Sequence, residues 1–138
     1  MAVGKEVQEK MLTYRILEAR LDGLVKQRDM IANKIWEIET TLQSIAEISK
    51  SKEEILFPIG SEAYTFGRAM DKDKLIVEIG AGIALEKNIE EGKETLNRRK
   101  TELENAMKDI QEDVAEISNN IEMLAADIQQ SPDYEQAG

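Results

Sequence analysis

Carboxylates are the residues of this chain whose number and spacing could support chemistry. The 138 residues include 28 Asp and Glu, 18 Lys and Arg, and neither His nor Cys. Paired carboxylates can act as general acid and base, but these lie on open helix faces with no pocket to raise a pKa. Without His the commonest general base is missing, and without Cys a disulfide or thiolate zinc site is excluded. We therefore expect no enzyme, catalytic residue, cofactor or bound metal.

Two short motifs resemble ligand sites only superficially. Gly80-Ala81-Gly82 lacks the extended glycine pattern and the Lys-Ser/Thr pair of a phosphate-binding loop. Asp71 and Asp73 could attract a cation, but the lysines at 72 and 74 compete with it and the ligands are too few. We expect the glycine motif to be a tight hairpin turn and residues 71–74 to be a polar hairpin loop.

The composition argues against several classes of partner. The net charge of −10 repels phosphate backbones and anionic membranes, so we expect neither nucleic acid nor membrane as a partner. Aromatic residues are 4% and charged residues 33%, which is typical of long solvated helices. The first residues have no apolar signal region, and no apolar run approaches the ~18 residues of a membrane span. We therefore expect a cytoplasmic protein.

Heptad-patterned stretches lie towards both ends of the sequence. The first seam consists of Val3, Val7, Lys10, Tyr14, Leu17, Leu21, Leu24, Arg28, Ile31, Ile35, Ile38, Leu42, Ile45 and Ser49. The second consists of Ile89, Lys93, Leu96, Lys100, Leu103, Met107, Ile110, Val114, Ile117, Ile121, Leu124 and Ile128. Eleven of fourteen and ten of twelve positions are apolar, which predicts two coiled-coil helices.

A β-rich insert separates the two predicted helices. The predicted elements are a helix over residues 5–50, strands over 53–59, 63–69, 75–79 and 83–87, and a helix over 88–130. Asn88 and Glu91 form a capping-box pattern at the second helix, and Ser131-Pro132 ends it. We expect an α+β fold, a long antiparallel two-helix coiled coil with two central β-hairpins that join an oligomeric β-barrel. Its parts are residues 1–52, 53–87 and 88–131, with a disordered tail at 132–138.

An antiparallel pairing fixes which residues face each other. If position 49 faces about position 90, facing numbers sum to roughly 139, and the two apolar patterns match along their length. Leu21 then meets Ile117, Leu17 meets Ile121, and Tyr14 meets Leu124. Arg28 is placed near Glu112 and Asp113, and Lys100 near Glu39. These seam cations either extend their stems along the seam to reach water or form salt bridges that set the register.

The insert should need partners. Four short strands with exposed edges and one incomplete apolar face are marginal alone, so inserts from several subunits could complete a shared sheet or barrel. The candidate oligomerisation residues are Leu56, Ile59, Tyr64, Phe66, Leu75, Val77, Ile79, Ile83 and Leu85.

The order helix, two hairpins, helix resembles a prefoldin subunit of the α class. The local likeness lies in Pro58-Ile59-Gly60, in residues 77–82 (Val-Glu-Ile-Gly-Ala-Gly) and in Glu86-Lys87, and with the flanking coils it covers nearly the whole chain. Two hairpins instead of one favour the α class over the β class. Ser61-Glu62-Ala63 departs from the smaller residues that the family often has there.

The resemblance implies an ATP-independent chaperone (holdase). Such subunits form a hexamer of two α-type and four β-type prefoldin subunits, with hairpins joined in a double β-barrel. Their coiled-coil tips capture unfolded client proteins, which are handed to a group II chaperonin. The alternative is a structural coiled-coil scaffold or filament subunit without client binding.

The predicted tip holds the candidate client-binding residues. They are Val3, Val7, Met11, Leu12, Tyr14, Met123, Leu124 and Ile128. Met11, Leu12 and Met123 lie off the seam, and Met suits adaptable contacts. Ordinary helix packing with incidental apolar surface is the alternative interpretation. Trp36, at an outward position, either contacts a neighbour or client, or lies flat along its own coil.

Overall fold

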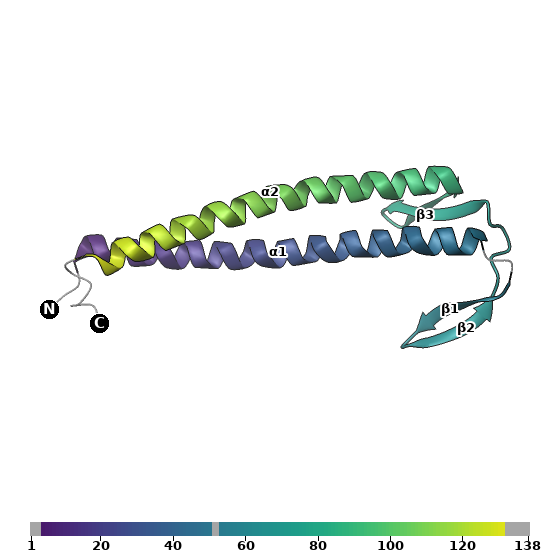
Figure 1. Cartoon of the computed structure of the whole chain (residues 1–138), viewed down its shortest axis with the longest axis horizontal. Coiled ribbons are helices and arrows are strands. Elements are labelled where there is room, and N and C mark those ends of the chain that lie inside the picture. The colour runs from purple at the N-terminus through teal and green to yellow at the C-terminus, as the bar shows by residue number, and fades with distance from the viewer. Residues whose placement is uncertain (1–3, 51–52, 132–138) are drawn as a thin grey trace. The chain divides into compact units, whose positions relative to one another are not determined.

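A computed structural model describes residues 4–50 and 53–131. The elements follow the order α1 (Lys5–Lys50), β1 (Ile55–Gly60), β2 (Ala63–Gly67), β3 (Lys74–Gly80), β4 (Ile83–Asn88) and α2 (Ile89–Gln129) (Figure 1). The chain divides into two compact units, and both helices contribute to each. Unit 1 comprises Met1–Asn33 with Glu104–Gly138, and unit 2 comprises Lys34–Leu103.

The helices begin and end where the sequence predicts. Asn88 accepts a hydrogen bond at Oδ1 from the Glu91 backbone N–H at 2.8 Å, as an N-cap residue should. Glu90 and Glu91 lie in the first turn of α2, near its positive end, and Lys50 lies in the last turn of α1. The predicted tail at 132–138 lies outside the described residues.

Burial follows the predicted heptad seam. Every described seam position from Val7 to Ile45 and from Ile89 to Ile128 is buried or half-buried, whereas Ser49 is exposed. This confirms the coiled-coil pattern, because a two-helix pair has no other interior.

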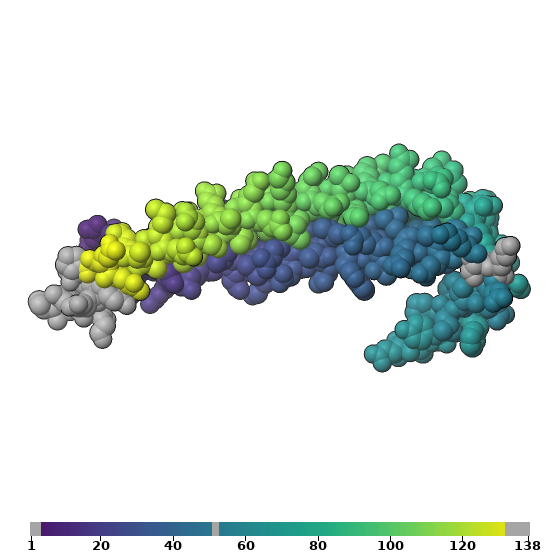
Figure 2. Space-filling model, in the orientation of Figure 1, coloured from purple at the N-terminus to yellow at the C-terminus, as the bar shows by residue number. Residues whose placement is uncertain are grey.

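In unit 1 the α1 and α2 segments run antiparallel, and Figure 2 shows them in contact. Val7, Ile110, Ile117 and Ile128 are its buried apolar side chains. Lys10 Nζ lies 2.7 Å from Asp127 Oδ2. The residue numbers 10 and 127 sum to 137, close to the sum of 139 that the predicted register gives for facing residues.

The helices of unit 2 keep the same register. Lys100 Nζ lies 3.3 Å from Glu39 Oε1, which confirms the proximity expected for this pair. Arg28, in unit 1, is different. Its guanidinium lies 3.6 Å from Asp29 of the same helix, and among the described residues no ion pair joins it to Glu112 or Asp113.

Two separate two-stranded antiparallel sheets make up the insert. In the first, β1 pairs with β2 and Leu56 lies opposite Phe66; in the second, β3 pairs with β4 and Val77 lies opposite Leu85. The prediction of two hairpins is confirmed. Residues 71–74 are not a hairpin loop, because β2 and β3 belong to different sheets. The segment instead joins the two hairpins, with Lys74 already in β3.

The two hairpin turns share one backbone geometry. Gly60 and Gly80 have φ of +119° and +113°, and each is followed by two residues of positive φ, at 61–62 and 81–82. Two central residues with positive φ match the twist of antiparallel strands. A register shift at Ile59 and at Ile79 precedes each turn. Gly80-Ala81-Gly82 is thus a hairpin turn, as predicted.

The second hairpin docks on the first turns of α2. The Ile89 N–H donates to the Asp73 carbonyl at 3.0 Å, and Arg99 Nη2 donates to the Glu78 carbonyl at 2.6 Å. A Cβ at Gly92 would lie only 2.6 Å from Leu75 Cδ1. The small residue on α2 therefore lets β3 approach the helix closely.

Candidate functional site

The predicted tip residues differ widely in exposure. Val7 and Ile128 are buried between the helices, and Met11, Tyr14 and Leu124 are half-buried. Leu12 and Met123 are exposed, at 59% and 64%. Val3 lies outside the described residues. The structure therefore separates seam residues, which hold unit 1 together, from off-seam residues that reach solvent.

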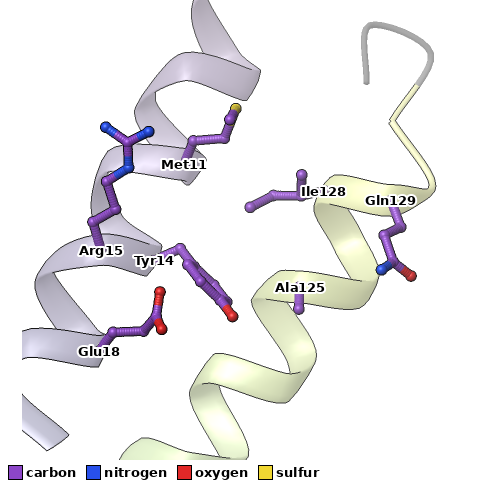
Figure 3. Close-up of a pocket in the computed structure, with 7 residues that line it drawn as sticks. All are labelled: Met11, Tyr14, Arg15, Glu18, Ala125, Ile128 and Gln129. Atoms are coloured by element: carbon purple, nitrogen blue, oxygen red, sulfur yellow. The ribbon is translucent and has the colours of Figure 1, made fainter. Parts of the chain in front are cut away.

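A groove runs between the helices of unit 1, where Ile128 extends from α2 towards α1 and Tyr14 extends from α1 towards Ala125 (Figure 3). Its volume is about 300 Å³. The lining residues are Met11, Tyr14, Arg15, Glu18, Ala125, Ile128 and Gln129. Met11 and Ile128, and likewise Tyr14 and Ala125, have numbers that sum to 139, the predicted register. The groove has an apolar floor and a polar edge formed by Arg15, Glu18 and Gln129.

A second groove, of about 610 Å³, lies along α2 in the same unit. It is lined by Asn120, Met123, Leu124, Ala126, Asp127 and Gln130. Asn119 Nδ2 donates to Met123 Sδ at 3.7 Å, and a thioether sulfur is only a weak hydrogen-bond acceptor. The thioether therefore sits at the surface with most of its area still available.

Ile16 belongs to this region and was missed by the sequence analysis. It is 59% exposed and follows Leu12 by four residues, on the same outer face of α1. Its off-seam position, one turn after Leu12, was the signal that could have found it. Leu12, Ile16 and Met123, together with the half-buried Met11, Tyr14 and Leu124, are called the terminal apolar cluster below.

An ion pair joins the helices beside this cluster. The hydrogen bond from Lys10 to Asp127 raises the pKa of Lys10 above 10.5, opposed by partial desolvation and assisted by the charges of Asp127 and Glu6. The ammonium of Lys10 is therefore charged at neutral pH. It holds the two chain segments of unit 1 together next to the exposed apolar groups.

The hairpin residues predicted for oligomerisation fall into two groups. Leu75 is half-buried and Val77 is 7% exposed, so the chain covers them itself. The others are exposed: Leu56, Ile59, Tyr64, Phe66, Ile79, Ile83 and Leu85. Ile76, which was not predicted, is 77% exposed on the opposite face of β3 from Val77.

Trp36 lies in unit 2 and is 65% exposed. This agrees with its predicted outward position. The exposure leaves both interpretations open, because a ring lying along its own helix and a ring awaiting a neighbour each keep one face in water.

The grooves of unit 1 offer a surface to which another chain can bind. Among the described residues, no group of three or more Asp, Glu, His or Cys side chains could hold a metal ion. In the same part of the chain, neither helix has an apolar stretch sufficient to cross a bilayer. The arrangement can contact apolar segments of another chain, and charged residues set the surroundings of those contacts.

Comparison with known proteins gives the class. The prefoldin family, described as Prefoldin subunit, matches residues 17–132. Prefoldin subunit alpha of Pyrococcus horikoshii is 31% identical over 130 residues, which cover 92% of this chain and 88% of that protein. Prefoldin subunit alpha of Methanosarcina acetivorans is 25% identical over 130 residues, covering 91% and 92%. The chain belongs to the prefoldin family and, by these relatives, is an α-class chaperone subunit.

A solved structure has the same fold. The filamentous PFD from Methanocaldococcus jannaschii, determined by cryo-EM, superposes with a TM-score of 0.70 at 23% sequence identity. The match covers 87% of this chain and 98% of that chain. The predicted fold class, two long helices with two small antiparallel hairpins, is thereby confirmed.

Proposed function

We propose that this chain is a subunit of an ATP-independent holdase that captures unfolded proteins with the terminal apolar cluster. The observation that carries the proposal is the exposure of Leu12, Ile16 and Met123 outside the seam. The helix pair does not need them for its own packing, since the seam residues already form its interior. Large apolar side chains that stay exposed and are not needed for internal packing favour contact with another chain.

The contacts are individually weak, which suits a holdase. Each cluster side chain is only partly available, and Met adapts to different neighbours because it is unbranched and polarizable. Several subunits that bind one client together would raise the apparent affinity by ~10²–10⁴ where the geometry allows. Release then requires no nucleotide. The glycine-rich segment at 80–82 forms the turn between β3 and β4.

The hairpins are proposed to assemble the oligomer. Each sheet has only two strands, so both strands of each are edges with unpaired backbone groups. Exposed apolar side chains, including Leu56, Phe66 and Ile76, accompany those edges. We propose partnership with β-type prefoldin subunits in a hexamer of two α and four β, and transfer of clients to a group II chaperonin in the cytoplasm.

A second candidate is a scaffold or filament subunit without client binding. The exposed hairpins favour it, because they would serve assembly equally well in either case. The two functions differ only at the terminal apolar cluster. Suppression of client aggregation therefore discriminates between them.

A truncation tests the proposal. Removing residues 1–12 and 123–138 deletes Met11, Leu12 and Met123 but none of unit 2. Mass measurement after mixing with a β-type subunit should show assembly unchanged. Light scattering of a diluted unfolded enzyme should show that most protection is lost. Full protection by the truncated assembly would instead overturn the assignment of client binding to the terminal apolar cluster, whereas no protection by the intact assembly would support the scaffold function.

A further inference from the structure

The groove along α2 in unit 1 has apolar lining and lies on a helix segment that is rich in carboxylates. Met123, Leu124 and Ala126 supply the apolar part, and Met123 is largely exposed. Apolar lining alone does not distinguish one apolar segment of an unfolded protein from another. Charged residues near the groove can make that distinction.

The two helices of unit 1 differ strongly in charge. Residues 4–33 of α1 hold six cations and five carboxylates. Residues 104–131 hold seven carboxylates and one cation, Lys108, for a net charge of −6. The carboxylates are Glu104, Asp109, Glu112, Asp113, Glu116, Glu122 and Asp127. Most of the acidity of unit 1 therefore lies on the helix that carries the groove.

These carboxylates are mostly unpaired. On α1, Glu6, Asp22 and Asp29 each lie within 4 Å of a cation of the same helix. On α2 between 104 and 131, Asp127 is the one carboxylate in the described residues with an ion pair, and its partner is Lys10. The unpaired carboxylates of α2 are therefore available to pair with cations of a bound partner.

Three of the unpaired carboxylates share the face of Met123. Asp109, Glu112 and Glu116 follow one another at spacings of four or fewer residues, and all are exposed. Met123 lies seven residues beyond Glu116, two turns and about 10 Å along the helix. An extended peptide spans about 10–13 Å in three or four residues, so one segment can contact both.

We propose that this groove prefers unfolded segments in which a large apolar residue lies three or four residues from Lys or Arg. This refinement rests on the proposed function. The apolar residue contacts Met123, Leu124 and Ala126, and the cation lies over the row of carboxylates. Acidic segments are repelled by the same row. The preference is electrostatic at an exposed surface, so salt weakens it.

Labelled peptides test the preference. Three 15-residue peptides with the same Leu residues and the same uncharged dye carry Lys, Gln or Glu three and four residues from each Leu. Fluorescence anisotropy measures their binding to the purified full-length chain. At low ionic strength we expect the Lys peptide to bind about three- to tenfold tighter than the Gln peptide, since exposed ion pairs are individually weak. The Glu peptide should bind least, and ~0.5 M salt should reduce the differences.

A matched pair of variants locates the effect. Asp109→Asn/Glu112→Gln/Glu116→Gln should abolish the Lys preference while keeping the binding of the Gln peptide. Glu47→Gln/Glu94→Gln/Glu102→Gln changes the net charge equally but in unit 2, and should keep the preference. Equal loss in both variants would assign the effect to overall charge and overturn the inference.

The remaining outcomes separate this inference from the function beneath it. Equal affinity for all three peptides would overturn the preference but leave client binding intact. Binding of a Lys peptide without Leu at full strength would also overturn it, because the groove would then be irrelevant. Failure of every peptide to bind would overturn the proposed function itself.

Discussion

The docking of the second hairpin on α2 depends on Gly92 and can be tested by enlarging that residue. A Cβ at position 92 would lie 2.6 Å from Leu75 Cδ1, 3.5 Å from its Cβ and 3.6 Å from its Cγ. An added methyl group therefore meets the end of a flexible side chain, which can turn away. A branched side chain would also meet the Leu75 stem, which cannot move without moving β3.

The expected magnitudes follow from these contacts. Gly92→Ala gains about 1 kcal/mol of helix propensity and loses about 1 kcal/mol through a displaced Leu75 rotamer, so the stability should hardly change. Gly92→Val should lower the free energy of unfolding by about 2 kcal/mol relative to Gly92→Ala, through overpacking and a β-branched residue in a helix. Gly23 has nothing within 4 Å of a built Cβ, so Gly23→Ala is a control that should stabilise by about 1 kcal/mol.

Urea unfolding followed by circular dichroism measures the stability, and hydrogen exchange of β3 and β4 amides reports the docking directly. Adding Leu75→Ala to Gly92→Val should restore part of the lost free energy of unfolding, because it removes the side chain with which the larger residue at position 92 clashes. Equal stability and equal exchange for the Ala and Val variants would refute the close packing of Leu75 against Gly92.

Three further predictions follow from local geometry. Glu62, at a φ of 64°, holds a left-handed conformation, so Glu62→Gly should stabilise the first hairpin by up to about 1 kcal/mol, seen as slower amide exchange in β1 and β2; faster exchange would count against the turn geometry. The raised pKa of Lys10 means that its pair with Asp127 stabilises the folded state below about pH 10.5 and is lost as the pH rises through the raised value. The difference in Tm between wild type and Lys10→Met should therefore be constant from pH 7 to 9 and should shrink only as the pH rises above about 10.5. A decline of this difference between pH 7 and 9 would be inconsistent with the ion pair. Leu21→Cys/Ile117→Cys should give a disulfide within one chain, seen as a faster-migrating monomer on a non-reducing gel, whereas disulfides only between chains would disprove the register.

The long helices were predictable because the residues buried in a helix pair all lie along one seam, where each helix contacts the other at regular intervals. A 3-4 spacing of apolar residues identifies that seam, and the register followed from equal counting outward from the insert, as the Lys100–Glu39 pair confirms. The turns were predictable because Gly60 and Gly80, which directly precede the central turn residues, adopt positive φ that glycine allows at little cost.

The side chains on the hairpins were harder to place from sequence. Alternation shows that Val77 and Ile76 lie on opposite faces, but not which face the chain covers for itself. That depends on the approach of α2, which Gly92 permits. The partner of Arg28 was also hard to name from sequence, because heptad counting does not show which of several nearby carboxylates a flexible cation pairs with. Val77 consequently reports on hairpin docking, and Ile76 is the better residue for testing assembly.

The central claim is that the terminal apolar cluster binds unfolded protein. The most direct measurement compares Leu12→Gln/Ile16→Gln/Met123→Gln with a control, Met30→Gln/Met70→Gln, whose methionines are also exposed but lie outside the cluster. Light scattering of a guanidinium-unfolded enzyme after dilution gives the amount of chain that halves aggregation. We predict that the cluster variant requires about tenfold more chain, corresponding to about 1.4 kcal/mol of lost apolar contact, while the control behaves as wild type. Equal protection by the cluster variant and wild type, with helix content and assembly unchanged, would contradict the claim.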